Sequence, residues 1–249
     1  MRGFGIALLA AAAMTASAAK AADLPVKAAP MAPVAAPYNW TGVYLGGNVG
    51  YMWANQDVNW PASIGVTNFK HTPNTGIGGF QAGIQYQWTN LVLGVEFNWF
   101  GTFNNNDATG SPQTGCPAAA FTCQTGVDNI WTIGPRLGWA LNDWLIYGTG
   151  GYAQGDIHTR SFEIATGAVF DDFDKRHGGW FAGAGVEYAF WKTATLDGIL
   201  GLEYQHIDLG TVRMLSPGDG GLFDVDTRDI RTTADLVRAR LSIKGNFFH

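Results

Sequence analysis

The chain has 249 residues, with 15 Lys and Arg against 20 Asp and Glu, which gives a net charge of −5 at pH 7. This acidic balance and the lack of a basic patch argue against a nucleic-acid-binding protein. The composition combines 34 Gly, 10 Trp and 15 Phe with only 14 % charged residues. No apolar run after residue 21 is long enough for a transmembrane helix. Such a composition is typical of strands that place apolar side chains on one face only.

The first 21 residues have the features of a secretory signal peptide. Arg2 supplies an early positive charge, residues 6–19 form a short apolar run, and the motif AKA at residues 19–21 fits the small-x-small cleavage rule. We therefore predict that residues 1–21 are removed on export and that the mature chain begins at Ala22. A short membrane anchor is the alternative interpretation of this run.

Residues 22–37, with the sequence ADLPVKAAPMAPVAAP, are rich in proline and alanine. Four prolines in this stretch oppose both helix and strand, and the segment lacks the periodicity of a core-forming element. We expect an extended periplasmic tether. A plain leader without any partner explains the composition equally well.

Residues 38–249 are predicted to form one domain, in which alternation of side-chain character is the strongest pattern. In residues 78–88, one face carries Phe80 and Trp88, whereas the opposite face carries Gln81. This period of two persists over the roughly 9–11 residues that a tilted membrane-crossing strand needs. Strands of soluble sandwiches usually end after about 5–6 residues.

The same alternation recurs along the chain, in the segments 43–53, 78–88, 91–99, 131–139, 180–190, 200–206 and 239–247. An eighth segment, 144–154, has the length of a strand, but its glycines leave its facing open. We therefore predict an all-β fold: a single-chain, antiparallel, up-and-down transmembrane β-barrel of about eight strands.

The connections between these segments alternate between short and long. Short connections are expected at residues 89–90, 141–143 and 191–194, and long ones at residues 54–74, 101–127, 157–177 and 211–228. Short periplasmic turns and long outer loops are typical of outer-membrane barrels. This asymmetry places both termini in the periplasm.

Aromatic residues gather at both ends of the predicted strands. Those near the short turns are Trp40, Trp88, Trp139, Trp144, Phe190 and Phe247, and those near the long loops are Trp53, Phe80, Trp99, Trp131 and Trp180. Amphipathic rings collect at the two membrane–water interfaces. A soluble lipocalin-like barrel would explain many aromatic rings, but not two separate bands.

Several strand motifs resemble those of a known family. The segments YNWTGVYLGGNVGY, GWFAGAGVEYAF, GLEYQHIDLG and VRARLSIKGNF, together with the leader DLPVKAAP, look like those of the small outer-membrane surface antigens. These are porin-like immunogenic barrels related to opacity proteins. The resemblance implies an eight-stranded barrel in the cell outer membrane, with a role in envelope integrity or host contact.

The resemblance also implies a set of partners. Such chains usually end on an outward aromatic residue that the barrel-assembly machinery recognises. Phe247 has that phase here, although Phe248 and His249 follow it. Outer-membrane lipid is a further expected partner, and periplasmic or cell-surface proteins are candidates.

The predicted inward faces carry charges of both signs, namely Glu96, Arg136, Glu187, Glu203, Arg238, Arg240 and Lys244. The interior of a small barrel is filled by side chains, so these charges must pair or hold water. An interior network of salt bridges is the favoured interpretation, and a charge-lined pore is the alternative. We expect Glu203 to pair with Arg238 or Arg240, because the last two strands are neighbours in a meander.

Cys116 and Cys123 lie in the second predicted long loop. Export to an oxidising compartment favours a local disulfide between them. Two cysteines without nearby histidines make a poor zinc site, so no metal is expected.

No catalytic or cofactor motif is convincing. His158 and Ser161 share the third predicted long loop, but no nucleophile elbow or acidic partner is evident, so solvated loop residues are expected. The run GTGGYA at residues 148–153 imitates a dinucleotide fingerprint without a following helix. The sequence therefore predicts a surface-exposed structural barrel without enzymatic activity or cofactor. A narrow porin-like channel for small solutes is the alternative, and an outer-membrane enzyme is a more remote one.

Overall fold

The computed structural model describes residues 37–59, 68–103, 108–109, 121–163, 165–216 and 226–246. The predicted signal peptide and all but the last residue of the predicted tether lie outside this part of the chain. The strands are β1 (Gly42–Asn59), β2 (Asn68–His71), β3 (Asn74–Trp88), β4 (Leu91–Thr102), β5 (Ala108–Thr109), β6 (Phe121–Leu141), β7 (Trp144–Glu163), β8 (Val169–Lys192), β9 (Leu196–Ser216) and β10 (Asp226–Gly245). The described residues contain no helix that is long and apolar enough to cross a membrane.

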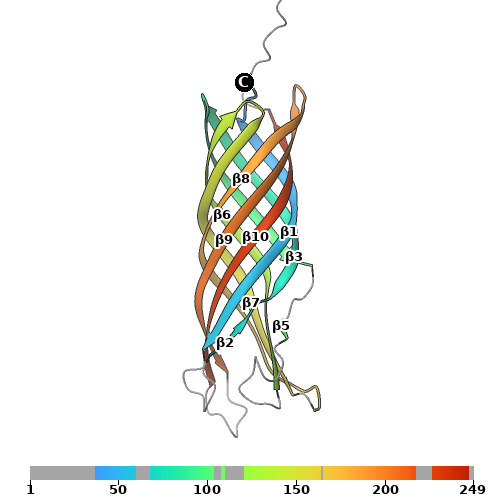
Figure 1. Ribbon diagram of the computed structural model, residues 1–249, viewed down its shortest axis with the longest axis vertical. Helices are drawn as coiled ribbons and strands as arrows, with labels where there is room; N and C mark the ends of the chain where they lie inside the picture. The colour runs from blue at the N-terminus through green and yellow to red at the C-terminus, as the bar shows by residue number, and fades with distance from the viewer. Residues whose placement is uncertain are drawn as a thin grey trace, which may run out of the picture. The chain divides into compact units, whose positions relative to one another are not determined.

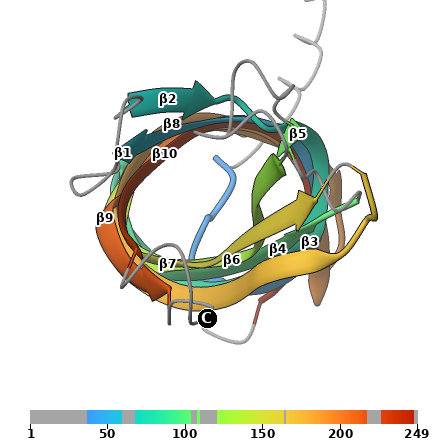
Figure 2. The same cartoon turned by 90° about the horizontal axis from the view of Figure 1, so that it is seen from below.

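The strands close into an antiparallel ring (Figures 1 and 2). Neighbours follow the order β10-β9-β8-β7-β6-β4-β3-β1, and pairing of β10 with β1 from Val43↔Gly245 to Asn59↔Asp229 completes the ring. Strands β2 and β5 extend the wall, since β2 pairs with β1 and β5 with β6 beyond the ends of the β1–β3 and β4–β6 ladders. Of the ten strands in the described residues, eight therefore form the barrel, and the predicted fold class is confirmed.

Alternation along each strand separates an outward face from an inward face. In β1, Leu45 is 61 % exposed, whereas its neighbour Tyr44 is 3 % exposed. The facing predicted for the other alternating segments agrees with the burial pattern, except that Gly245, expected on the outward face, is buried. Phe247, expected on the same face, lies outside the described residues. In β7, whose facing the sequence left open, Ile146 points outward and Tyr147 inward.

Two bands of outward aromatic rings border the apolar outer surface. At the long-loop end, Phe80 stacks on Trp99 with centroids 5.6 Å apart, and Trp131 contacts Tyr152 at 5.4 Å. At the short-turn end, Trp144 contacts Tyr188 at 4.6 Å. Trp40, predicted to belong to this second band, is instead fully buried, because the chain before β1 turns into the barrel.

Strand pairing continues further toward the long loops than the sequence suggested. Strand β8 has 24 residues, more than twice the roughly 9–11 that a tilted strand needs to cross a bilayer. The segment 157–177, predicted as a loop, is mostly strand, with β7 ending at Glu163 and β8 beginning at Val169. Polar residues in this segment concealed the ladder, because a strand outside the membrane has no need for an apolar outer face. The turns at the other end are short, at residues 142–143 for example.

The barrel interior has three successive layers. Along β4, Val92 belongs to an apolar cluster near the short turns, Glu96 is charged, and Phe100 belongs to a second apolar cluster toward the long loops. Strand β9 repeats this order with Ile199, Glu203 and Ile207. A buried charged layer therefore lies between two apolar ones.

Candidate functional site

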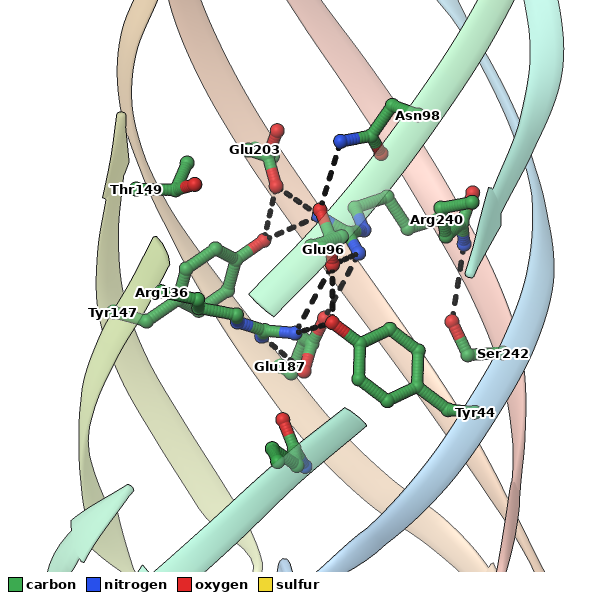
Figure 3. Close-up of polar contacts among 12 residues, drawn as sticks. Tyr44, Glu96, Asn98, Arg136, Tyr147, Thr149, Glu187, Glu203, Arg240 and Ser242 are labelled. Carbon is green, nitrogen blue, oxygen red and sulfur yellow. Dashed lines mark hydrogen bonds and ion pairs between the residues drawn. The ribbon is translucent and has the colours of Figure 1, made fainter. Parts of the chain in front are cut away.

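Glu96 lies at the centre of the charged layer (Figure 3). Its Oε2 accepts hydrogen bonds from the Tyr44 hydroxyl at 2.6 Å and from Arg136 Nη1 at 3.3 Å. Its Oε1 accepts from Arg240 Nη1 at 2.9 Å and from Asn98 Nδ2 at 3.1 Å. One carboxylate thus binds donors from four other positions, and all five side chains are buried.

Glu203 binds both arginines of the last strand. Its Oε1 accepts from Arg238 Nη2 at 2.6 Å, and its Oε2 forms an ion pair with Arg240. The Tyr147 hydroxyl donates to the same Oε2 at 2.5 Å. Arg238 Nη2 also reaches Asn98 Oδ1 at 2.9 Å, which links this pair to the side chains around Glu96.

Arg136 connects the third carboxylate to this layer. Its Nη2 lies 2.5 Å from Glu187 Oε2, and its guanidinium stacks over the Tyr147 ring with the Cζ atom 3.6 Å from the ring centroid. Arg240 Nη2 also lies 3.7 Å from Glu187 Oε1. The charged layer therefore contains three carboxylates and three guanidinium groups, whose formal charges cancel.

These contacts run across the barrel as well as between adjacent strands. Arg240 in β10 binds Glu96 in β4, although β1 and β3 separate these strands in the ring. Burying unpaired charges is costly, so such a layer is stable only when each charge finds partners of opposite sign and further hydrogen bonds. The two tyrosines and Asn98 supply those additional hydrogen bonds.

Two glycines make room for the tyrosines. Gly83 lies opposite Tyr44 in the β1–β3 ladder, and a Cβ there would come within 2.4 Å of the Tyr44 ring and hydroxyl. Gly185 lies opposite Tyr147, and a Cβ there would come within 2.5 Å of that hydroxyl. Cross-strand pairing of glycine with an aromatic residue thus leaves room for both rings inside the barrel.

Lys244 contacts a different group of residues at the short-turn end. Its Nζ lies 3.4 Å from Asp197 Oδ2 and donates to the backbone carbonyls of Asn39 and Thr41. The Tyr38 hydroxyl donates to the same Asp197 oxygen at 2.8 Å. Burial and this hydrogen bond raise the pKa of Tyr38 above its ordinary value, so the hydroxyl remains a donor.

The structure thus brings six of the seven predicted charged residues into one cluster and places the seventh, Lys244, with Asp197. Sequence reasoning missed Asp197, although it has the same phase as Glu203 on β9. It also missed Tyr147, because the facing of its strand was ambiguous. Tyr44 was on a predicted inward face, but nothing in the sequence indicated that it reaches Glu96.

The structure does not test the predicted disulfide or the predicted assembly signal. Phe247 and Cys116 lie outside the described residues. Cys123 lies in β6, where its backbone pairs with Ser161 of β7. The disulfide and the assembly signal therefore stay predictions.

His158 differs from its predicted role as a solvated loop residue. It is buried in β7, and its Nδ1 lies 3.0 Å from Asp128 Oδ2. Asp128 lies at a bulge where the β6–β7 register shifts between Val127 and Ile130. An acidic partner is therefore present, and it comes from a neighbouring strand that sequence spacing did not connect to His158.

Comparisons with known proteins agree with this architecture. A family model described as the outer membrane protein beta-barrel domain matches residues 5–236. The 31 kDa outer-membrane immunogenic protein of Brucella melitensis biotype 1 is 31 % identical over 262 residues, covering 97 % of this chain and 99 % of the relative. The 25 kDa outer-membrane immunogenic protein of Brucella abortus biovar 1 is 28 % identical over 199 residues, covering 80 % of this chain and 79 % of the relative.

The outer membrane protein OprG from Pseudomonas aeruginosa aligns with a TM-score of 0.43 and 10 % sequence identity, covering 86 % of this chain and 98 % of that chain.

Proposed function

This chain belongs to the outer membrane protein beta-barrel domain family, and from that membership we propose that it is a sealed structural barrel that presents its long-loop end at the cell surface. It resides in the outer membrane. Its contribution is to envelope integrity and to surface contact, and it does not conduct solutes. The observation that carries this proposal is the neutral, fully buried charge network between two apolar layers.

The network supports a closed lumen on three grounds. About eight strands leave an interior just wide enough for side chains to fill. The guanidinium groups of Arg136, Arg238 and Arg240 are engaged by carboxylates and are at most 2 % exposed. An ion pathway would more naturally carry charges of one sign at its constriction. This arrangement does not favour the narrow-channel alternative.

Surface presentation is supported by the part of the barrel beyond the aromatic bands. Its outward faces carry cross-strand ion pairs, such as Arg176 with Asp156 at 2.7 Å and Arg213 with Asp229 at 2.8 Å. Its inward face carries apolar residues such as Ile230. An apolar inside and a charged outside suit a wall that stands in water. The names of the Brucella relatives, which are outer-membrane immunogenic proteins, support the same position.

A catalytic role is not part of the proposal. The buried carboxylates of Glu96 and Glu203 bind arginine and tyrosine partners, which leaves them unavailable to a substrate. The partners that the proposal retains are outer-membrane lipid, the barrel-assembly machinery that would read the end of the last strand, and proteins in the periplasm or at the cell surface.

Conductance of the refolded protein in planar bilayers tests the proposal. We expect no stable current steps at neutral pH, while a known porin inserted under the same conditions conducts. Stable openings of porin size from the pure wild-type protein would overturn the sealed barrel and establish the narrow-channel alternative.

A further inference from the structure

The residues just before β1 do not continue the barrel wall. Residues 37–41 have no strand pairing, yet Tyr38 and Trp40 are only 8 % and 0 % exposed. Figure 2 shows this blue segment inside the ring of strands. Both rings belong to the apolar cluster at the short-turn end, with Val92, Ala140, Leu145, Tyr147, Ala189 and Ile199. The chain therefore places two aromatic side chains in the end of its own barrel.

This segment has a specific seat. The Trp40 backbone N–H donates to Gln87 Oε1 at 2.7 Å, and its carbonyl accepts from Gln85 Nε2 at 2.8 Å. The indole Nε1 donates to the carbonyl of Asn142, in the turn between β6 and β7, at 3.3 Å. Trp40 is thus held by hydrogen bonds to β3 and to the β6–β7 turn, which lies on the far side of β4. Loose packing alone would not give this set of specific contacts.

A buried cation of the barrel also binds this segment. Lys244 is buried, and its ammonium is bound by Asp197 and by the backbone carbonyls of Asn39 and Thr41. The Tyr38 ring lies 4.6 Å from the same ammonium. Without this segment, Lys244 would keep only the carboxylate among these partners, so a buried cation would need water instead.

We infer that residues 37–41 form an N-terminal plug that closes the short-turn end of the lumen independently of the charge network. This inference rests on the proposed sealed barrel and adds a second closure to it. The charge network blocks the middle of the lumen, and the plug shields the stretch between the network and the short turns. That stretch contains Ser242, which lies between Arg240 and Lys244 on the inward face of β10 and is 3 % exposed.

Thiol accessibility at Ser242 tests the inference. In a Cys116→Ser, Cys123→Ser background, Ser242→Cys reports on the short-turn side of the network. Thr232→Cys, at a fully buried position on the long-loop side, reports on the other half. The barrel is refolded into lipid vesicles or micelles, and a small cationic methanethiosulfonate reagent is added.

We expect slow labelling of both reporters when Trp40 is present. Trp40→Ala should speed labelling at Ser242→Cys by at least about tenfold, because a reagent reacts only at positions that water reaches. Labelling at Thr232→Cys should stay slow. Trp139→Ala, which removes an outward tryptophan at the same end, is the matched control and should leave Ser242→Cys slow.

Folding is monitored by the faster migration of unheated barrel in a detergent gel. Should Trp40→Ala not fold, Trp40→Leu, which keeps apolar bulk and loses the bond to Asn142, should give an intermediate labelling rate. Unchanged protection of Ser242→Cys in a folded Trp40 variant would overturn the plug, and so would equal acceleration at Thr232→Cys, which indicates general loosening. Conductance separates the two proposals. Folded Trp40→Ala should remain silent in bilayers, whereas current through the wild type would refute the sealed barrel whatever the labelling shows.

Discussion

Arg240 is the residue on which most of the charged layer depends. It binds the carboxylates of Glu96 and Glu203 and lies 3.7 Å from that of Glu187. Arg238 cannot take its place, because Arg238 is already bound to Glu203 and Asn98. A buried ion pair adds little net stability compared with apolar packing, but removing one partner leaves an uncompensated charge. Removing Arg240 should therefore lower the stability of the barrel much more than the net contribution of its ion pairs would suggest.

Replacing Arg240 with alanine should destabilise the barrel by about 3–5 kcal/mol, because two buried carboxylates lose a common partner. The measurement is reversible urea unfolding in lipid vesicles or micelles. Arg176→Ala is the control in a more exposed pair. Its partner Asp156 lies 2.7 Å away, and the two side chains are 65 % and 35 % exposed, so the lost pair should cost about 0–1 kcal/mol. Equal effects of the two substitutions would show that the interior pairs contribute no more than surface pairs.

At the scale of the elements, the sequence was most informative where a strand lies in the membrane. The period of two assigned the facing of β1, β3 and β4 correctly, because hydrocarbon on one side and a packed lumen on the other allow no other arrangement. Strand ends were less predictable. The polar residues near Glu163 led to the prediction of a loop, although backbone pairing extends the β-ladder there.

The composition of the charged layer could be predicted, but its connections could not. Phase places Glu96 and Arg240 on inward faces, yet their contact crosses the ring between strands that are not neighbours. Such a contact depends on strand number and register, which local spacing does not encode. Trp40 was assigned to the wrong environment for a related reason: its aromatic character fits an interface and a plug equally well.

The outward face of β4 provides the element-scale prediction. Val95 is 50 % exposed and lies midway between the levels of Leu91 and Trp99, which pair with the aromatic residues Trp139 and Trp131. Val95→Arg should cost about 2–4 kcal/mol, because it places a cation near the bilayer midplane. Unfolding from lipid vesicles measures this loss. Ala165→Arg, in the exposed turn before β8, should be nearly neutral. A neutral Val95→Arg would contradict the assigned lipid face.

The whole barrel reverses its polarity along its axis. In the middle of the barrel, apolar side chains such as Leu202 point outward and charges such as Glu203 point inward. Toward the long loops, Arg213 and Asp229 point outward, while Val212 and Ile230 are buried inside. The same strands therefore contact lipid along one part of their length and water along the other. It is packed like a membrane barrel in one part and like a water-soluble barrel in the other.

This reversal predicts resistance to proteolysis beyond the membrane. If the polar part is a packed barrel, trypsin should cut slowly after Arg213 and Arg231, since both residues lie in the β9–β10 ladder and their neighbours Val212 and Ile230 are buried. Cleavage must wait for local opening of that ladder, so it should be slower by on the order of 100-fold than in heat-unfolded protein. Mass spectrometry of timed digests measures each cut. Rapid cleavage after either arginine, in protein that still migrates as a folded barrel, would mean that this part opens freely and cannot act as a rigid support for the surface loops.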